Sequence, residues 1–355
     1  MPLIPHEQLH SLAERILLAC DVPAEHAALV ATTLVATNLR GTDSHGIQLL
    51  TFYVDQLLAG DMIAGETGEI VSENGTSMVY DSANGIGQVT AQICAGHAAR
   101  LAALHGVGIV TARNCNHFGA AFWWAQQIAE PANIGPRNIG IVMCDASPLV
   151  APWQGREPRF GTNPICFALP GKESFLLDMA TTTVAAGRIF KASINQQETI
   201  PAGWALDAEG VPTTDTATAM HGLLMPLGGY KGTGLAMMVE ILCGVLSGGK
   251  VSTEIGSIRK RGRPSQLNHF FLAIDLRRFG DVAEIGARAE MLANMVRSAA
   301  PAKGYDEVLV AGEVERRTEA ERRQNGIPLP EGNWETLLAT AHKVGVPGAR
   351  SALSS

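Results

Sequence analysis

The hydrophobic residues of this chain change their spacing along the sequence, and that change restricts the folds open to it. In the N-terminal part apolar residues recur every three or four positions, over 9–20, 27–39 and 50–58. This spacing places them on one face of a helix, so we expect three helices there. Pro23 separates the first two and Gly60 ends the third, because proline and glycine interrupt helical backbone.

From about residue 76 the apolar residues come in short β-rich runs with helical segments between them. We expect strands at 78–80, 107–111, 139–143, 165–168, 175–177, 270–274 and 308–310, and helices at 88–104, 235–246, 285–296 and 334–341. Strands and helices mixed in this way are typical of an α/β fold. The sequence therefore predicts an α/β core with helical segments at both ends.

Composition excludes several classes of protein. The chain is 46% hydrophobic and 17% charged, which is typical of a globular protein and not of a disordered one. Its formal net charge of −7 argues against nucleic acid as a partner, and no apolar stretch is long enough to span a membrane. We interpret the one basic run, 259–263, as a solvated loop in preference to a phosphate-binding segment.

Two features bear on the compartment. The N-terminus lacks the basic segment and apolar segment of a secretory signal. The six cysteines form no C-x-x-C pair and most lie in apolar runs, which indicates buried free thiols and not a disulfide framework. We therefore expect a cytoplasmic protein.

Two short motifs imitate known sites, and we favour a structural role for both. Residues 6–10 match H-E-x-x-H, but they open the first helix without a third ligand, so we expect no metal. Gly85-Ile86-Gly87 lies between an expected strand and helix, as in a dinucleotide-binding unit. However, Thr90 stands where that fingerprint needs a small residue, and the next strand ends at Arg113 and not at an acid.

Two histidines lie in settings that suit catalysis. His45 lies in a polar segment, 40–46, between two helical stretches, and His117 follows an expected buried strand. Core strand ends are where α/β enzymes place reactive groups, and imidazole exchanges protons near neutral pH. The residues alone leave a structural role open for each.

Two further segments suit a phosphate-bearing cofactor. In 228–234 a glycine-rich loop containing Lys231 opens into an apolar helix, and exposed N–H groups at a helix start attract phosphate. Residues 177–183 offer Asp178 and three threonine hydroxyls at a strand end. Their alternative role is to cap a following helix.

Together these segments resemble the type-2 malate/L-lactate dehydrogenase family, which includes ureidoglycolate, sulfolactate and diketogulonate oxidoreductases and a cyclic-imine reductase. The matching segments occur in one order over nearly the whole chain. They are 40–46, 85–88, 113–120, 155–158, 161–164, 177–181, 200–207, 212–215 and 228–232, and the similarity continues through 271–275 to 326–327.

The resemblance implies a non-Rossmann mixed sheet flanked by helices. It implies a helical domain made of residues 1–75 and the C-terminal helices within 280–355, around a core of residues 76–279. It also implies a homodimer, bound NAD or NADP, and a small 2-oxo or 2-hydroxy acid as substrate, with no nucleic acid and no membrane as partner.

By the same resemblance, each candidate residue has a role. His117 and His45 are the proton donors or acceptors, and Ser44 and Tyr53 lie near the substrate. The cofactor is lined by Asp178, Met179, Ala180, Thr181, Thr182, Lys231, Gly232, Gly312 and Glu313. We expect a hydride to pass between the nicotinamide and the substrate carbon while an imidazole moves the proton, with His117 favoured by its place at a strand end.

The chain also departs from the family. Leu49 stands where relatives usually carry an arginine that can hold the substrate carboxylate, and Arg159 is an alternative source of that charge. Residues 131–138 resemble an insertion, and Trp153-Gln154 stands where the family often has a glycine. Reduction of a cyclic imine carboxylate, or a protein that keeps the fold without turnover, are therefore the alternative functions.

Overall fold

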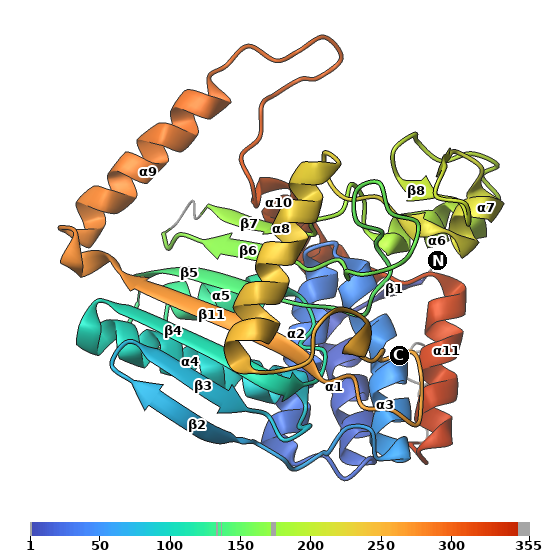
Figure 1. Cartoon of the computed structure of the whole chain (residues 1–355), viewed down its shortest axis with the longest axis horizontal. Coiled ribbons are helices and arrows are strands. Elements are labelled where there is room, and N and C mark those ends of the chain that lie inside the picture. Colours follow the sequence, from blue (N-terminus) through green and yellow to red (C-terminus); the bar gives the residue numbers. More distant parts are fainter. Residues whose placement is uncertain (1, 133, 136, 172–174, 347–355) are drawn as a thin grey trace.

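A seven-stranded mixed sheet runs through the middle of the computed structural model, which describes residues 2–132, 134–135, 137–171 and 175–346 (Figure 1). The strand order is β2-β3-β4-β11-β5-β6-β7, in which β3 and β4 are parallel and the other neighbours antiparallel. The strands are β2 Glu69–Asn74, β3 Ser77–Asp81, β4 Val107–Cys115, β5 Asn138–Cys144, β6 Ile165–Ala168, β7 Leu176–Met179 and β11 Leu267–Asp275. The mixed α/β fold expected from the sequence is confirmed.

Helices cover both faces of this sheet. α4, Gly87–His105, and α5, Ala121–Ala129, pack against one face and share its main apolar core. α8, Tyr230–Glu240, continues into the π-helical η3, Ile241–Val245, and packs against the other face (Figure 1). Because β11 is covered on both sides, its residues form a nearly continuous buried run and not an alternating one.

The two ends of the chain meet in a helical part beside the sheet. α1, His6–Leu18, α2, Ala24–Leu39, and α3, Leu50–Ala59, share one apolar cluster with α11, Glu331–Lys343. The short strands β1, Leu3–Ile4, and β12, Ile327–Pro328, pair with each other. α10, Glu313–Asn325, contacts α2.

A small lobe carries elements too short for a periodic pattern to predict. It contains α6 Ala186–Ile194, α7 Thr216–His221, and a three-stranded sheet of β8 Ala205–Leu206, β9 Pro212–Thr213 and β10 Leu223–Leu224. A separate apolar cluster holds this lobe together.

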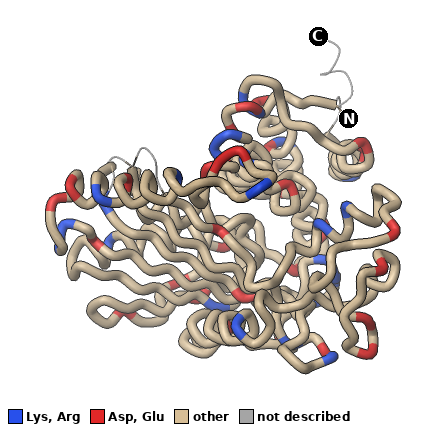
Figure 2. Tube along the Cα trace, turned by 90° about the horizontal axis from the view of Figure 1, so that it is seen from above, with Lys and Arg blue, Asp and Glu red and all other residues tan. Residues whose placement is uncertain are grey.

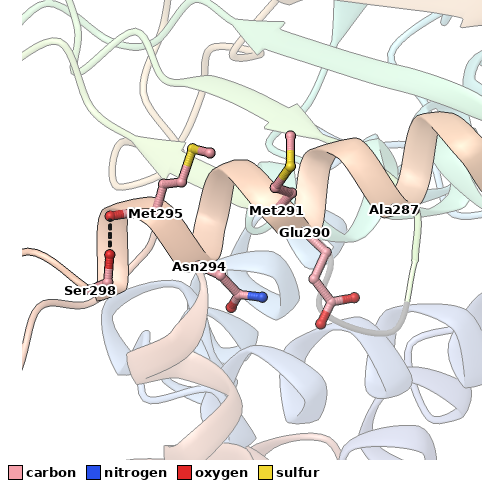
Figure 3. Close-up of a pocket in the computed structure, with 6 residues that line it drawn as sticks. All are labelled: Ala287, Glu290, Met291, Asn294, Met295 and Ser298. Carbon is pink, nitrogen blue, oxygen red and sulfur yellow. Dashed lines mark hydrogen bonds between the residues drawn. The ribbon is translucent and has the colours of Figure 1, made fainter.

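Helix α9, Val282–Arg297, projects away from the rest of the molecule (Figure 1). None of its residues is buried. Met291 and Met295 point to one side of the helix, and Glu290 and Asn294 point to the other (Figure 3). The helix therefore presents an apolar stripe that this chain itself does not cover.

Several sequence expectations need correction. The strand expected at 308–310 is wrong, because this segment forms no strand and the Val310 N–H donates to the Glu313 carboxylate at 2.7 Å. The helix expected from 235 begins at Tyr230 and ends in the π-helical turn. β2 lies before residue 75 yet belongs to the central sheet. α9 lies apart from the N-terminal helices that it was expected to complete.

Charged positions are interspersed along the chain trace (Figure 2). Within the described ranges, no helix combines the length and the apolar character needed to cross a bilayer.

An ion pair joins the polar segment after α2 to the C-terminal helix α10. The Arg322 guanidinium donates to both carboxylate oxygens of Asp43, at 2.7 and 3.1 Å, and Asn38 donates to the same carboxylate at 2.6 Å. Arg322 is largely buried, with 14% of its side chain exposed. This contact fixes the turn that carries Ser44 and His45.

Replacement of Arg322 tests that role. We expect Arg322→Ala to lower the free energy of unfolding by about 1–3 kcal/mol, because the Asp43 carboxylate loses its charged partner. The neighbouring Arg323, which pairs with Glu319 at the surface, is the matched control, and Arg323→Ala should change stability by less than about 0.5 kcal/mol. Urea denaturation measures both, and equal losses would contradict the assignment.

Candidate active site

One edge of the sheet gathers the segments singled out in the sequence. Strand pairing places Cys115 opposite Leu267 and Cys144 opposite His269. It also places Ile165 opposite both Met143 and Met179. The end of β4, which leads to His117, and the end of β7, which leads to Ala180, therefore lie at the same edge.

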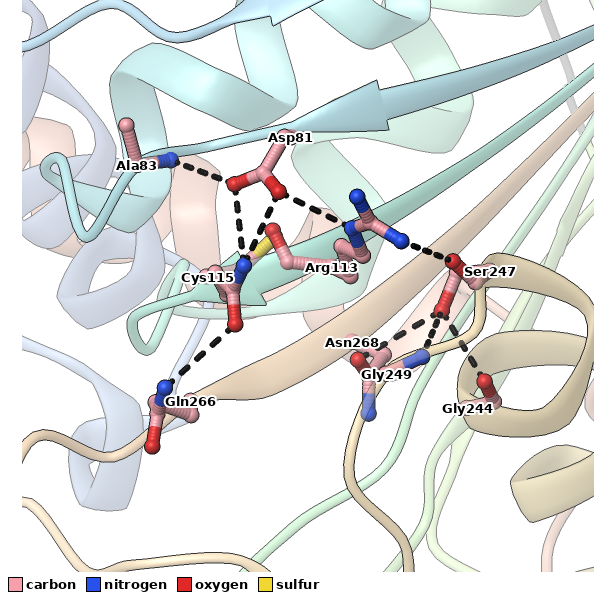
Figure 4. Close-up of polar contacts among 10 residues, drawn as sticks. Asp81, Ala83, Arg113, Cys115, Gly244, Ser247, Gly249, Gln266 and Asn268 are labelled. Atoms are coloured by element: carbon pink, nitrogen blue, oxygen red, sulfur yellow. Dashed lines mark hydrogen bonds and ion pairs between the residues drawn. The ribbon is translucent and has the colours of Figure 1, made fainter. Parts of the chain in front are cut away.

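The segment after β4 is fixed by a polar network at the strand ends. The Asp81 carboxylate accepts from Arg113 Nε at 2.9 Å, from Asn114 Nδ2 and from the Ala83 N–H (Figure 4). Asn114 has a φ of 52°, and the contact with Asp81 stabilises this left-handed conformation. Asn116 is fully buried and donates to carbonyl oxygens of 84 and 85.

Gly87 allows this segment to sit against the start of α4. A Cβ atom at residue 87 would lie 2.2 Å from the Asn116 carbonyl oxygen and 2.4 Å from that of His117. β3, α4 and β4 do form the parallel unit that the glycines suggested. However, the turn at Gly87 packs against the backbone of Asn116 and His117.

His117 is held by two contacts to its Nδ1 atom. The Tyr53 hydroxyl lies 2.8 Å from Nδ1, and the Gly119 N–H donates to it at 3.1 Å. Burial lowers the pKa of His117 well below its ordinary value, and the neighbouring His45 lowers it further. Burial raises the pKa of Tyr53, which keeps its proton.

His45 stacks on His117, with ring centroids 5.6 Å apart and planes 24° apart. Its Nδ1 lies 2.9 Å from the Ser44 hydroxyl. Burial and the charge of Arg259 lower the pKa of His45 to about 4. The structure therefore brings together all four residues expected at the substrate, and both imidazoles are neutral at pH 7.

Asp178 on β7 is linked to the histidine segment through α5. Its Oδ2 accepts from the Phe122 N–H at 2.9 Å, and the Arg40 guanidinium lies over the Phe122 ring. Although the side chain opens to solvent, surrounding protein raises the pKa of Asp178 to about 6, and the Phe122 N–H and Arg40 oppose that shift. Arg40 and Phe122 are site residues that the sequence patterns did not single out.

The Lys231 loop lies directly beside the segment that follows β7. Leu227 N donates to the Thr181 carbonyl at 2.9 Å, and a Cβ at Gly232 would lie 2.8 Å from that same oxygen. The two segments expected to hold a cofactor are thus neighbours. Lys231 is exposed at the start of α8, and the described residues give its ammonium no ion pair.

The threonine hydroxyls in this segment do not cap a helix. Thr181 donates to the Thr162 carbonyl and Thr182 to the Val184 carbonyl, whereas α6 begins at Ala186 after Ala185. Thr183 donates to the Pro226 carbonyl. The helix-cap alternative is therefore wrong, because all three hydroxyls donate to backbone carbonyls.

Gly312 and Glu313 lie at the other end of β7. Leu176 N donates to the Ala311 carbonyl, and a Cβ at Gly312 would lie 3.1 Å from the Leu176 Cβ. Glu313 accepts from the Val310 N–H and, at 2.6 Å, from Arg297 Nε. Against the effect of burial, these two donors hold the pKa of Glu313 below its ordinary value. The expected cofactor residues therefore follow β7 from end to end.

The basic run 259–263 is exposed along its whole length, as expected of a solvated loop, but Arg259 also makes a contact that the sequence did not indicate. Its guanidinium lies over the Phe52 ring, 4.6 Å from the centroid, and its charge lowers the pKa of both site histidines. Arg159 instead pairs with Glu157. Leu49 is buried at the start of α3, 3% exposed. No pattern in the sequence indicated that the loop containing Arg259 returns to α3.

The H-E-x-x-H segment has other contacts. His6 pairs with Glu7, and His10 Nε2 lies 3.0 Å from the Thr32 hydroxyl. Among the described residues no three His, Cys, Asp or Glu side chains gather as a metal site would need. A third histidine near the site, His269, is fully buried and donates to the Asn116 carbonyl, so it has a structural role.

Comparison with known proteins identifies the family of this chain. Residues 4–338 match the model of the malate/L-lactate dehydrogenase family. The chain belongs to this family. It is a dehydrogenase, and therefore an oxidoreductase acting on CH–OH groups.

Its relatives match it along nearly their full length. A malate dehydrogenase of Pyrococcus horikoshii is 36% identical, with 97% of this chain and 96% of the relative covered. The solved structure of sulfolactate dehydrogenase from Methanocaldococcus jannaschii superposes with a TM-score of 0.90 at 32% identity, covering 99% of each chain. The structure of a delta1-piperideine-2-carboxylate reductase from Pseudomonas syringae gives a TM-score of 0.82 at 26% identity, covering 96% of this dehydrogenase and 100% of that chain.

Proposed function

We propose that this dehydrogenase uses NAD or NADP to transfer a hydride to or from a small 2-oxo or 2-hydroxy acid. The observation that carries the proposal is the stacked pair of His45 and His117, with Ser44 and Tyr53 on their Nδ1 atoms. The pair lies at the sheet edge that also receives the Asp178 segment. Relatives named malate and sulfolactate dehydrogenases support a substrate with a hydroxyl or carbonyl beside a carboxylate.

The residues around α8 fit a dinucleotide. Gly228 and Gly229 have φ values of 58° and 65°, so the loop turns tightly. The Gly229 and Lys231 N–H groups donate to the carbonyls of Pro226 and Gly228, whereas the N–H groups of Tyr230 and Gly232 have no acceptor among the described residues. Those N–H groups and Lys231 suit a pyrophosphate, and the backbone from Asp178 to Thr182 adjoins them. When bound, the nicotinamide supplies or accepts the hydride at the substrate carbon.

Of the two contacts of His117, the one with Tyr53 suits a proton transfer at Nε2. The Gly119 N–H can only donate, so it favours the tautomer with an unprotonated Nδ1. The Tyr53 hydroxyl can accept as well as donate, so it can also hold a proton on Nδ1. In that second tautomer Nε2 takes the substrate proton during oxidation, and the imidazolium returns it during reduction.

A cyclic imine carboxylate is the second candidate substrate, because the chain superposes on a delta1-piperideine-2-carboxylate reductase. The same imidazole would then protonate a nitrogen. Assays of 2-oxo acids and cyclic imines with both reduced cofactors distinguish the two. Cofactor binding without turnover of either would indicate a protein that keeps the fold alone, which retention of both histidines disfavours.

We also infer a homodimer in a reducing compartment. A 16-residue helix such as α9 gains little stability without packing, and its exposed Met291, Leu292 and Met295 suit a second copy of the chain. The six cysteines are buried free thiols, which supports a cytoplasmic location.

Removal of Lys231 tests the cofactor site. We expect Lys231→Ala to weaken binding of NADH or NADPH by about ten- to a hundredfold, because a charge-assisted hydrogen bond is lost. Lys343→Ala removes the same charge from α11, where the lysine pairs with Asp55, and should leave affinity unchanged. Fluorescence titration measures both, and equal affinities would refute the assignment.

Removal of either histidine tests the proton transfer. We expect His117→Ala or His45→Ala to reduce turnover by roughly 10²–10⁴ with little change in cofactor affinity. His221→Ala, at an exposed position, is the control.

The pH profile is a second measurement on the wild type. Because both histidine pKa values are lowered, the neutral base persists below pH 6.5. The acidic limb of kcat/KM for oxidation should therefore lie below 6.5. Single variants that keep wild-type turnover, or a limb at or above 6.5, would contradict the mechanism.

A double charge on α9 tests the dimer. We expect the wild type to sediment as a dimer and the Met291→Glu, Met295→Glu double variant as a monomer, because two carboxylates cannot be buried without partners. Leu58→Glu places a charge at an exposed apolar position on α3 and should remain dimeric. A monomeric wild type, or a dimeric double variant, would rule out this interface.

A further inference from the structure

Arg259 is a charged side chain that the site leaves without an opposite charge. Arg113 pairs with Asp81, Arg40 with Glu319 and Arg322 with Asp43. In contrast, no acidic group of the described residues pairs with Arg259. Its guanidinium instead lies 4.6 Å from the Phe52 centroid and 6.0 Å from that of Phe190.

The loop that carries Arg259 is anchored to α3. Gln56 is fully buried and donates from Nε2 to the carbonyl oxygens of Ile258, at 3.3 Å, and Lys260, at 2.8 Å. The Asp61 carboxylate accepts from the Gly262 N–H at 2.6 Å. The backbone on both sides of Arg259 is therefore held against the same helix.

Both rings beside Arg259 belong to segments that also contact the residues of the histidine pair. Phe52 precedes Tyr53, whose hydroxyl contacts His117. Phe190 lies on α6, whose Gly187 approaches the Ser44 side chain so closely that a Cβ there would lie 3.1 Å from the Ser44 Cβ. The charge of Arg259 acts on both imidazoles, so the guanidinium lies within electrostatic reach of the reacting group.

We propose that Arg259 binds the carboxylate of the substrate and thereby positions the 2-oxo group beside the histidines. A guanidinium offers a carboxylate two parallel hydrogen bonds, and one face of this guanidinium remains on Phe52 while its edge can donate. The inference rests on the proposed function and specifies how the acid is held.

The surroundings of Arg259 also indicate the substrate class. Leu49 lies three residues before Phe52, which places both on one face of the helical segment, and Phe190 is 49% exposed. Because Leu49 is only 3% exposed, the apolar surface beside the guanidinium comes from Phe52 and Phe190, which add no second positive charge. The site therefore favours a 2-oxo acid with one carboxylate and an apolar side chain over a dicarboxylate such as oxaloacetate.

The experiment compares Arg259→Met with Arg261→Met, which removes the same charge from an exposed position two residues along the loop. With an apolar 2-oxo monocarboxylate, Arg259→Met should raise KM by about ten- to a hundredfold and Arg261→Met should not. Arg259→Lys should recover part of the loss. The dissociation constant of NADH should stay unchanged in all three variants.

A binding measurement adds a readout independent of turnover. Oxamate, an unreactive 2-oxo acid analogue, should bind to the NADH complex of the wild type and of Arg261→Met, and at least tenfold more weakly to that of Arg259→Met. Equal effects of both methionine variants on KM and oxamate affinity would overturn the proposal, as would oxaloacetate being a better wild-type substrate than the apolar acids. A wild type that binds NADH but reduces no 2-oxo acid would instead refute the proposed function.

Discussion

Strand β11 pairs with β4 on one side and with β5 on the other, and so joins β2–β4 and β5–β7 into one sheet. β11 is formed by residues 267–275, whereas its neighbours end at residues 115 and 144. Without it, β2–β4 and β5–β7 would present two unpaired edges. The strand is buried on both faces, so hydrogen bonds and apolar packing act together to insert it.

The insertion of β11 also determines which side chains lie together at the candidate site. It aligns the end of β4 with the end of β7, so that the histidine segment and the segment proposed to hold the cofactor, some sixty residues apart, lie at one edge. The helical part approaches the same edge from outside and adds Ser44, His45 and Tyr53. The site thus combines a rigid sheet edge with a turn held by helices from both ends of the chain.

Sequence patterns predicted the long elements well because their periodicity is strong, as in α1, α4 and β11. They missed short elements such as β8–β10, whose two-residue strands carry no period. The segment 308–310 has strand-like residues, but the start of α10 takes its hydrogen bond and no strand forms.

The site was predictable to a similar, limited extent. His45, His117 and the Lys231 loop lie in local patterns that suggest chemistry. Arg259, Arg40 and Phe122 gain their meaning from contacts made across the fold. A basic run read by itself gives no sign that Phe52, some two hundred positions earlier, lies beneath one of its arginines.

The contact between Asp43 and Arg322 has a consequence for biosynthesis. The turn that carries Ser44 and His45 is synthesised well before the guanidinium that fixes it, which lies 279 residues further along the chain. The nascent chain therefore carries this turn without its charged partner until α10 has been made. The turn takes its final form only when α10 docks on α2.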